Sequence, residues 1–224
     1  FALGFATMPG TSSELFKAGS AAEKLAVAYP RSPNVQYDYG TAGFRGLAST
    51  FECVAVRCGM IAALRSLACG SSTTHKGEGL AVGVMITASH NPEQDNGVKL
   101  VDPAGDMLDM EWELPAAAVA NCQEKELTSK LQQLSEEKKC NFEVLPHVFV
   151  GRDSRESSPH LCSLLVKGVE SLGGKVTDIG LAATPQLHWC VNEYNRGREG
   201  TLSAYCSAVG GAFLELMASS SSSS

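Results

Sequence analysis

One short stretch of the chain concentrates the side chains that could do chemistry. Residues 87–92 read Thr-Ala-Ser-His-Asn-Pro, and Lys99 lies ten residues beyond Ser89. The apolar run 80–87 precedes them and predicts a strand that is buried on both faces. Ligands bind beyond the carboxyl ends of strands in open α/β sheets. The sequence therefore predicts that Ser89 presents its hydroxyl to a ligand.

Three interpretations of this stretch compete when it is taken alone. A Ser–His hydrolase needs His90 as the base for Ser89, but adjacent side chains in extended backbone point apart, and no Gly-x-Ser-x-Gly elbow surrounds the serine. In a structural interpretation, Ser89 caps a turn while His90 and Lys99 are solvated. In the third, a phosphoryl group is transferred through Ser89, and Lys99, Arg45 and His90 manage charge and protons. Spacing alone leaves these interpretations open.

The elements expected to position this stretch alternate between strands and helices. Apolar periodicity, serine caps and glycine stops predict helices over 12–27, 52–69, 111–139, 158–172, 184–192 and 201–218. Apolar, β-branched runs predict strands over 80–87, 98–101, 148–151 and 175–179. Pro92 and a turn at Asn96-Gly97 are expected to separate the first two strands. This order predicts an α/β/α sandwich with a mixed, largely parallel sheet.

Composition argues against several classes of partner. The chain has 224 residues, with 18 Lys and Arg against 24 Asp and Glu, so its net charge is −6. We expect no nucleic-acid partner and no membrane, since such partners favour a basic surface. No apolar run approaches the roughly 18 residues of a membrane-spanning helix, and residues 1–6 lack the basic start of a signal peptide. Eight cysteines without Cys-x-x-Cys or zinc-ligand spacing predict free thiols in a reducing, cytoplasmic compartment.

The chain divides into four expected parts. Residues 1–34 are expected to form an N-terminal helix and loop, and 35–195 the main α/β domain. The segment 193–200 has the polar composition of a linker, and 196–218 is expected to be the truncated start of a second domain. The serine run 219–224 is of low complexity and is expected to be disordered.

Several segments together carry a family resemblance. Residues 39–45 read Tyr-Gly-Thr-Ala-Gly-Phe-Arg, 95–100 read Asp-Asn-Gly-Val-Lys-Leu, 151–155 read Gly-Arg-Asp-Ser-Arg and 184–188 read Thr-Pro-Gln-Leu-His. With 87–92, they closely resemble the α-D-phosphohexomutase superfamily, over roughly residues 35–217. The continuation Asp-Asn-Gly-Val-Lys-Leu-Val-Asp-Pro favours the phosphoacetylglucosamine mutase branch over phosphoglucomutases and phosphomannomutases.

The resemblance implies the first domain of the phosphohexomutase fold and a specific reaction. That reaction interconverts N-acetylglucosamine 6-phosphate and N-acetylglucosamine 1-phosphate, on the route to UDP-N-acetylglucosamine. The serine matching Ser89 forms the phosphoserine intermediate, whose phosphate ligates Mg²⁺, and a sugar bisphosphate serves as intermediate and activator. Lys99, Arg45 and His90 are the other catalytic candidates, for proton transfer or phosphate orientation. Substrate or its phosphate is expected to contact Thr41, Asn91 and Arg45.

The family fold has four domains, and the resemblance covers the first and the opening of the second. We expect the metal-binding, sugar-recognition and phosphate-binding loops of domains II–IV to be missing, so those domains are expected partners. The isolated chain is then expected to be a poor mutase. A phosphoglucomutase- or phosphomannomutase-type substrate stays open as an alternative. So does a non-catalytic fragment that binds a partner through the surface the second domain would cover.

Two further motifs have structural interpretations beside functional ones. Arg152, Asp153 and Arg155 follow a predicted strand end and could reach the serine loop, although a salt-bridged structural turn is favoured. Thr184-Pro185 is interpreted as a helix start. His147 is interpreted as having no role in the chemistry.

Overall fold

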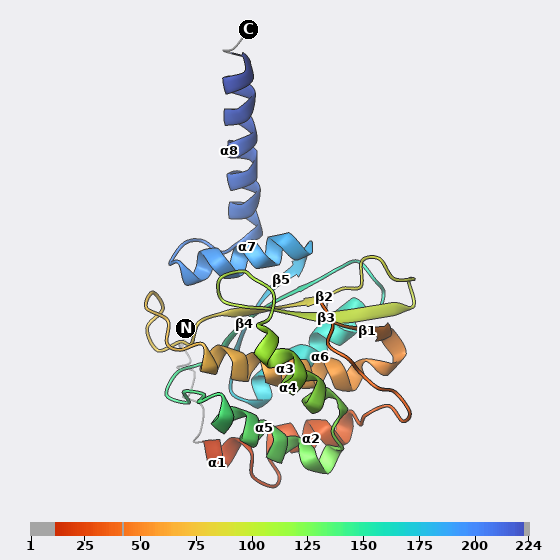
Figure 1. The fold of residues 1–224 in the computed structure, drawn as a ribbon. Coiled ribbons are helices and arrows are strands. Elements are labelled where there is room, and N and C mark those ends of the chain that lie inside the picture. The colour runs from red at the N-terminus through yellow and green to blue at the C-terminus, as the bar shows by residue number, and fades with distance from the viewer. Residues whose placement is uncertain (1–11, 42, 222–224) are drawn as a thin grey trace, which may run out of the picture.

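A five-stranded sheet with helices on both faces organises the chain (Figure 1). The computed structural model describes residues 12–41 and 43–221. Its strands are β1 (Phe44–Leu47), β2 (Val82–Ile86), β3 (Asp95–Val101), β4 (His147–Arg152) and β5 (Lys175–Leu181), in the order β1-β3-β2-β4-β5. Strand β3 pairs antiparallel with β1 and β2, whereas β2, β4 and β5 pair in parallel. The predicted mixed, largely parallel sheet is confirmed.

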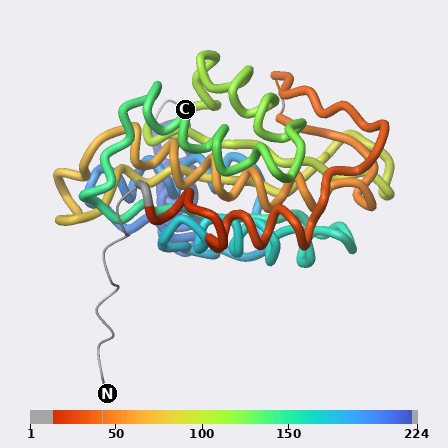
Figure 2. Tube along the Cα trace, turned by 90° about the horizontal axis from the view of Figure 1, so that it is seen from below, coloured from red at the N-terminus to blue at the C-terminus, as the bar shows by residue number. Residues whose placement is uncertain are grey.

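Helices form the layers on either side of this sheet. The face beneath the sheet in Figure 1 is covered by α3 (Glu52–Ala68) and α6 (Ser158–Ser171), and the opposite face by α7 (Thr184–Asn195). Outside α3 and α6 lie α2 (Ala21–Ala28), α4 (Met110–Asn121) and α5 (Leu127–Glu137), as the view from below shows (Figure 2). The remaining short elements are α1 (Ser12–Leu15), η1 (Ala48–Thr50) and η2 (Glu124–Glu126).

The sheet separates two apolar clusters. The larger lies between the sheet, α3, α6 and the outer helices. The smaller lies under α7, where Met85, Phe149 and Leu187 pack together. Every residue of β2 is buried, which fits the continuous apolar run that predicted this strand.

Helices α3 and α6 meet backbone to backbone through two glycines. A Cβ on Gly168 would lie 2.0 Å from the Val56 carbonyl oxygen, and one on Gly59 would lie 2.1 Å from that of Leu165. No side chain fits at such distances, so these glycines set the spacing of the layer that supports the sheet.

A charged cluster lies at the end of the sheet where β4 and β5 begin, opposite to the end where β2 stops. The imidazole of His147 is fully buried; its Nδ1 lies 3.1 Å from Glu78 Oε2 and its Nε2 lies 2.8 Å from Thr177 Oγ1. Lys175 and Tyr194 donate to the same Glu78 carboxylate at 2.8 Å each. Burial and the Lys175 charge lower the pKa of His147 to about 4, against the opposing effect of Glu78.

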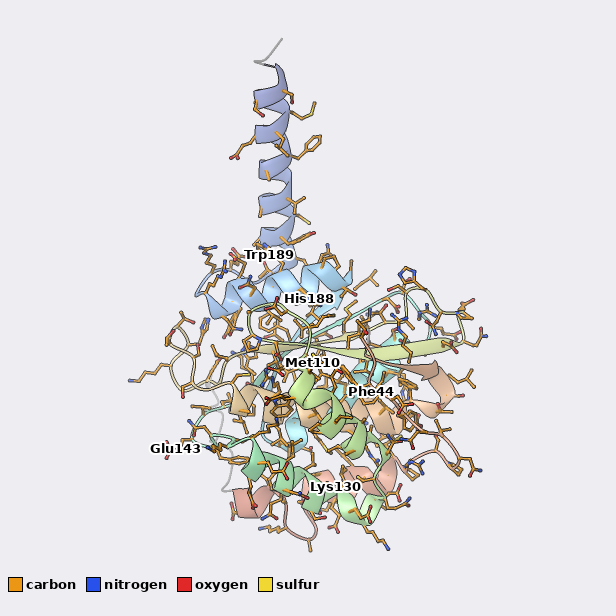
Figure 3. All side chains as sticks on the ribbon, viewed as in Figure 1. Phe44, Met110, Lys130, Glu143, His188 and Trp189 are labelled. Carbon is orange, nitrogen blue, oxygen red and sulfur yellow. The ribbon has the colours of Figure 1, made fainter. Side chains whose placement is uncertain are left out.

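Helix α8 (Leu202–Ser221) projects away from the sandwich (Figure 1). Trp189, labelled on α7 in Figure 3, meets Tyr205 edge to face at 5.5 Å and joins the two helices. By length and composition, the α8 segment Leu202–Ser220 could cross a membrane: its mean hydropathy is 1.2 and none of it is buried. The expectation that no apolar run approaches this length is therefore wrong. Small residues and Glu215 dilute the run, which is why it escapes inspection of the sequence.

The predicted N-terminal and C-terminal helices also need correction. The helix expected over 12–27 is split into α1 and α2, because Gly19 adopts a φ of +77° and Ser20 caps α2 by accepting from the Glu23 amide. Helix α8 extends through Ser219–Ser221, and the Ser220 hydroxyl donates to the Leu216 carbonyl. The disorder expected for the serine run stays a prediction. Residues 1–11 of the predicted N-terminal part and residues 222–224 of the predicted serine run lie outside the described residues.

A predicted turn lies within a strand, and the start of a predicted linker lies within a helix. Asn96 and Gly97 lie inside β3 and do not form a turn, because Asn96 is buried and its amide donates to the hydroxyls of Ser157 and Ser158. The linker expected from residue 193 begins later, because α7 continues to Asn195, whose side chain bonds to both backbone groups of Ala81.

The helix–helix contact gives a first testable prediction. Gly168→Ala is expected to lower the free energy of unfolding by about 1–3 kcal/mol, since the new methyl group overpacks the interface. Gly210→Ala on α8 is the matched control, because a Cβ there meets nothing within 4 Å. Urea unfolding measures both. Equal stability of Gly168→Ala and the wild type would contradict the close contact.

The depressed His147 pKa gives a second prediction. Between its ordinary value of 6.5 and about 4, the unfolded chain binds a proton that the folded chain does not. Stability therefore falls as pH decreases through this range, and the His147 share amounts to about 3 kcal/mol at pH 4. Urea unfolding at pH 7 and pH 4 should show a smaller loss for His147→Gln. An identical loss in both proteins would show that His147 titrates normally.

Candidate functional site

An open cleft of about 1060 Å³ lies where β2 and β4 end. Ser89, His90, Asn91 and Lys99 line it together with Asp153, and the first residues of α7 form part of its wall. Four of the predicted site residues therefore share one cavity, and the Thr184-Pro185 helix start borders it as well.

Strand register brings the key polar groups together. The parallel pairing of β2 with β4 aligns Val82 with Val148 and ends with Ile86 beside Arg152. The next residues along the two strands are Thr87 and Asp153, and the Thr87 hydroxyl donates to Asp153 Oδ2 at 2.8 Å. Ser89 follows two residues later; it is exposed, and its Oγ lies 3.2 Å from Thr87 Oγ1.

Arg155 holds the loop that carries Ser89. Its guanidinium donates to four backbone carbonyl oxygens of this loop, those of Ala88, Asn91, Pro92 and Asp95. Its Nε donates to Asp153 Oδ2 at 3.1 Å. A planar guanidinium can serve several acceptors in fixed directions, so Arg155 fixes the loop's path. This agrees with the interpretation of the Arg152–Arg155 turn as structural, and it adds a direct contact with the serine loop.

The Asp153 carboxylate is saturated with donors. Oδ1 accepts from the Ser158 hydroxyl at 2.6 Å and from the Arg155 amide at 3.1 Å, while Oδ2 accepts from Thr87 and the Arg155 guanidinium. Burial alone would raise the pKa of Asp153, but these hydrogen bonds and the Arg155 charge outweigh it and lower that pKa. Asp153 is therefore an ionised acceptor at neutral pH.

Gly97 lets three strands converge beside the serine loop. A Cβ at this position would lie 2.6 Å from the carbonyl oxygens of both Phe44 and Thr87. The closeness of β1 places Arg45, which pairs with Gly97 across the strands, near Lys99. Burial lowers the pKa of Lys99 and the Arg45 charge lowers it further, against Asp153, which acts in the opposite direction.

The other predicted contacts lie at the margins of the cleft. Arg45 is exposed on β1, and its positive charge lowers the pKa of Lys99, which lines the cleft. Thr41 lines a smaller adjoining cavity of about 260 Å³, which shares Lys99 and Thr184 with the cleft. Neither a role for Thr87 nor its contact with Asp153 was predicted. The available signal was their place at strand ends, because Thr87 ends the predicted strand 80–87 and Asp153 follows the predicted strand 148–151 by two residues.

The described residues alone do not fit a Mg²⁺ ion. Among residues 12–41 and 43–221, no group of three or more His, Cys, Asp or Glu side chains is placed to hold a metal. Asp153, which lies one hydrogen bond beyond Thr87, already has both oxygens occupied. Mg²⁺ needs near-octahedral oxygen ligands, usually with carboxylates among them.

Comparison with known proteins decides the family. The description "Phosphoglucomutase/phosphomannomutase, alpha/beta/alpha domain I" matches residues 41–126 and 124–209. The chain belongs to this family. Proteins called phosphoacetylglucosamine mutase from Sus scrofa and Saccharomyces cerevisiae are 41% and 45% identical to it, covering 88% and 84% of its length. The matches cover 35% of each relative, so this family member spans about a third of the length of those proteins.

Solved structures agree with the family assignment. A serine-to-alanine variant of the Aspergillus fumigatus N-acetylphosphoglucosamine mutase, in complex with glucose 1,6-bisphosphate, superposes with a TM-score of 0.74 at 34% identity. The superposition covers 84% of this chain and 33% of the fungal chain. The same fungal enzyme in complex with GlcNAc-6P and magnesium gives a TM-score of 0.69 at 36% identity, over 78% and 30%. The predicted first domain of the phosphohexomutase fold is confirmed.

The Arg155 contacts give a prediction for this phosphohexomutase domain. Arg155→Lys replaces a guanidinium that serves four carbonyls with a single ammonium group, so amide exchange in residues 88–95 should accelerate at least about tenfold. The matched control is Arg198→Lys, because Arg198 pairs with Glu193 and its side chain is 64% exposed. Hydrogen-exchange mass spectrometry measures both. Unchanged protection of residues 88–95 in Arg155→Lys would refute the role given to this arginine.

Proposed function

We propose that this chain is the phosphoserine domain of a phosphoacetylglucosamine mutase. The observation that carries the proposal is the exposed Ser89 hydroxyl, held at the end of a buried strand in a cleft that also contains Lys99. Relatives of this name, and a solved relative with GlcNAc-6P and magnesium, support the choice of sugar. The reaction is the interconversion of N-acetylglucosamine 6-phosphate and 1-phosphate, on the route to UDP-N-acetylglucosamine.

In the proposed reaction, Ser89 stores a phosphoryl group. A hydroxyl oxygen of the sugar phosphate forms a bond to phosphorus, the bond from phosphorus to Ser89 Oγ breaks, and the sugar proton ends on Ser89. The bisphosphate then returns its other phosphoryl group to Ser89 with the reverse proton movement. A relative in complex with glucose 1,6-bisphosphate supports a bisphosphate intermediate and activator. Transfer of this kind depends mainly on positioning and charge stabilisation.

The surrounding residues supply proton transfer and phosphate binding in this proposal. Lys99 takes up the sugar proton, for which its lowered pKa suits it, and passes a proton on to the Ser89 oxygen as the bond from phosphorus to that oxygen breaks. Arg45 keeps the pKa of Lys99 low while it attracts phosphate oxygens. His90, Asn91 and Thr41 orient the substrate or its phosphate at the rim. Ser89 would contact Mg²⁺ through its phosphate, with the remaining carboxylate ligands supplied by other parts of a longer protein. A cytoplasmic location is proposed from the cysteine usage.

An exchange of segments tests this function. Residues 35–200 of this chain replace the matching part of the Saccharomyces cerevisiae enzyme, and ³¹P NMR follows the conversion of N-acetylglucosamine 6-phosphate. We expect turnover in the chimera and its loss, by at least about a thousandfold, in the same chimera with Ser89→Ala. A panel with glucose and mannose phosphates identifies a phosphoglucomutase- or phosphomannomutase-type substrate. A folded chimera without turnover on any of them would favour a non-catalytic fragment.

The Lys99 environment gives a prediction that requires no substrate. The pKa of Lys99 is expected below its ordinary 10.5, so its neutral fraction at a given pH exceeds that of a free lysine. Arg45→Gln removes a neighbouring positive charge and should raise that pKa, whereas Arg45→Lys should leave it nearly unchanged. NMR titration of the Lys99 side chain measures the three values. A Lys99 pKa that does not respond to Arg45→Gln would show that Arg45 does not lower the pKa of the proposed base.

A further inference from the structure

The side chains of Asp153, Thr87 and Ser89 form a hydrogen-bonded row that ends in the cleft. Asp153 Oδ2 and Thr87 Oγ1 are 2.8 Å apart, and Thr87 Oγ1 and Ser89 Oγ are 3.2 Å apart. Thr87, in the middle of the row, is 2% exposed, while Ser89 at its end opens to solvent. The row therefore connects an ionised, half-buried carboxylate in the wall of the cleft to the exposed hydroxyl of Ser89.

Proton counting gives this row one direction. Asp153 accepts from four donors and has no proton to give. A hydroxyl carries one proton, and the Thr87 hydroxyl donates it to Asp153. Thr87 can then only accept from Ser89, so the Ser89 hydroxyl must be the donor of the 3.2 Å contact. With its proton directed at Thr87, the Ser89 oxygen turns its lone pairs toward the cleft.

The backbone leaves Thr87 little freedom to change this arrangement. Its amide donates to the Gly97 carbonyl at 3.0 Å, and the Asp153 amide donates to the Ile86 carbonyl at 3.0 Å. Both residues thus continue the pairing of β2 with its neighbours past the last residues of the strands.

We propose that Thr87 and Asp153 are positioning residues that orient the Ser89 hydroxyl as a nucleophile for incoming phosphoryl groups. The inference rests on the proposed function for its chemistry, but the orientation itself does not. In the step concerned, Ser89 Oγ forms a bond to phosphorus of the sugar bisphosphate. The bond from phosphorus to the sugar oxygen breaks with its electron pair, and the Ser89 proton ends on that oxygen. A lone pair already facing the cleft reduces the reorganisation this attack needs.

The orientation is tested first on the full chain without any substrate. Three-bond couplings between the α and β protons of Ser89 report its side-chain rotamer. We expect one dominant rotamer in the wild type and in Thr87→Ser, which keeps the hydroxyl, but averaged couplings in Thr87→Val, which has nearly the same shape without it. A backbone amide spectrum checks that each variant is folded. Averaged couplings in the wild type, or a single rotamer in Thr87→Val, would overturn the positioning role.

The chemical consequence is tested by phosphoryl uptake in single turnover. The chimera that carries residues 35–200 of this chain in the Saccharomyces cerevisiae enzyme, with wild-type or substituted Thr87 and dephosphorylated beforehand, is mixed with glucose 1,6-bisphosphate and Mg²⁺. The phosphopeptide containing Ser89 is quantified by mass spectrometry. Uptake should slow about tenfold in Thr87→Val and stay within about twofold in Thr87→Ser, the size expected for one lost hydrogen bond. Equal rates in all three proteins would overturn the positioning role while keeping the phosphoserine. Absence of uptake in the wild type would instead count against the proposed function, and the couplings would still decide the orientation.

Discussion

The parallel pairing of β2 with β4 is the constraint on which the site depends. Its register carries Thr87 and Asp153 to adjacent positions beyond the last strand residues, where their side chains meet at 2.8 Å. Arg155 then follows Asp153 closely enough to reach the carbonyls of the serine loop. A one-residue slip would turn every side chain of β2 to the opposite face, so the register is fixed by the two apolar clusters as well. Core packing and site geometry therefore rest on the same strand pair.

Charge at the site is arranged locally, because the whole chain is acidic. The net charge of −6 opposes an anionic ligand, yet Lys99 lines the cleft and the positive charge of Arg45 on the neighbouring strand acts on it. Asp153 could repel phosphate, but its carboxylate is enclosed by two hydroxyls, an amide and the Arg155 guanidinium. These four donors compensate the Asp153 charge. Arg155 holds the loop that presents Ser89 through its backbone carbonyls, while the side chains of Ser89, His90 and Asn91 line the cleft.

The sequence allowed the sandwich, the strand carrying the serine and most of the helices to be predicted, because each rests on a local pattern. The β2 run and the α3 periodicity are examples. At one predicted turn, tertiary contacts overruled the local signal. Asn96-Gly97 has the composition of a turn, but Gly97 is needed where β1 and the end of β2 converge, and Asn96 anchors to α6. The contact of Thr87 with Asp153 spans 66 residues and depends on register, which no local pattern encodes.

Locating the transferred group along the protein shows whether Ser89 carries it. The chimera of residues 35–200 with the remaining Saccharomyces cerevisiae enzyme is incubated with glucose 1,6-bisphosphate and Mg²⁺, and the phosphorylated residue is identified by peptide mass spectrometry. We expect modification of Ser89, and an unmodified protein when Ser89→Ala is treated in the same way. Phosphate found instead on Ser154 or Thr184, which line the same cleft, or on no residue at all, would contradict it.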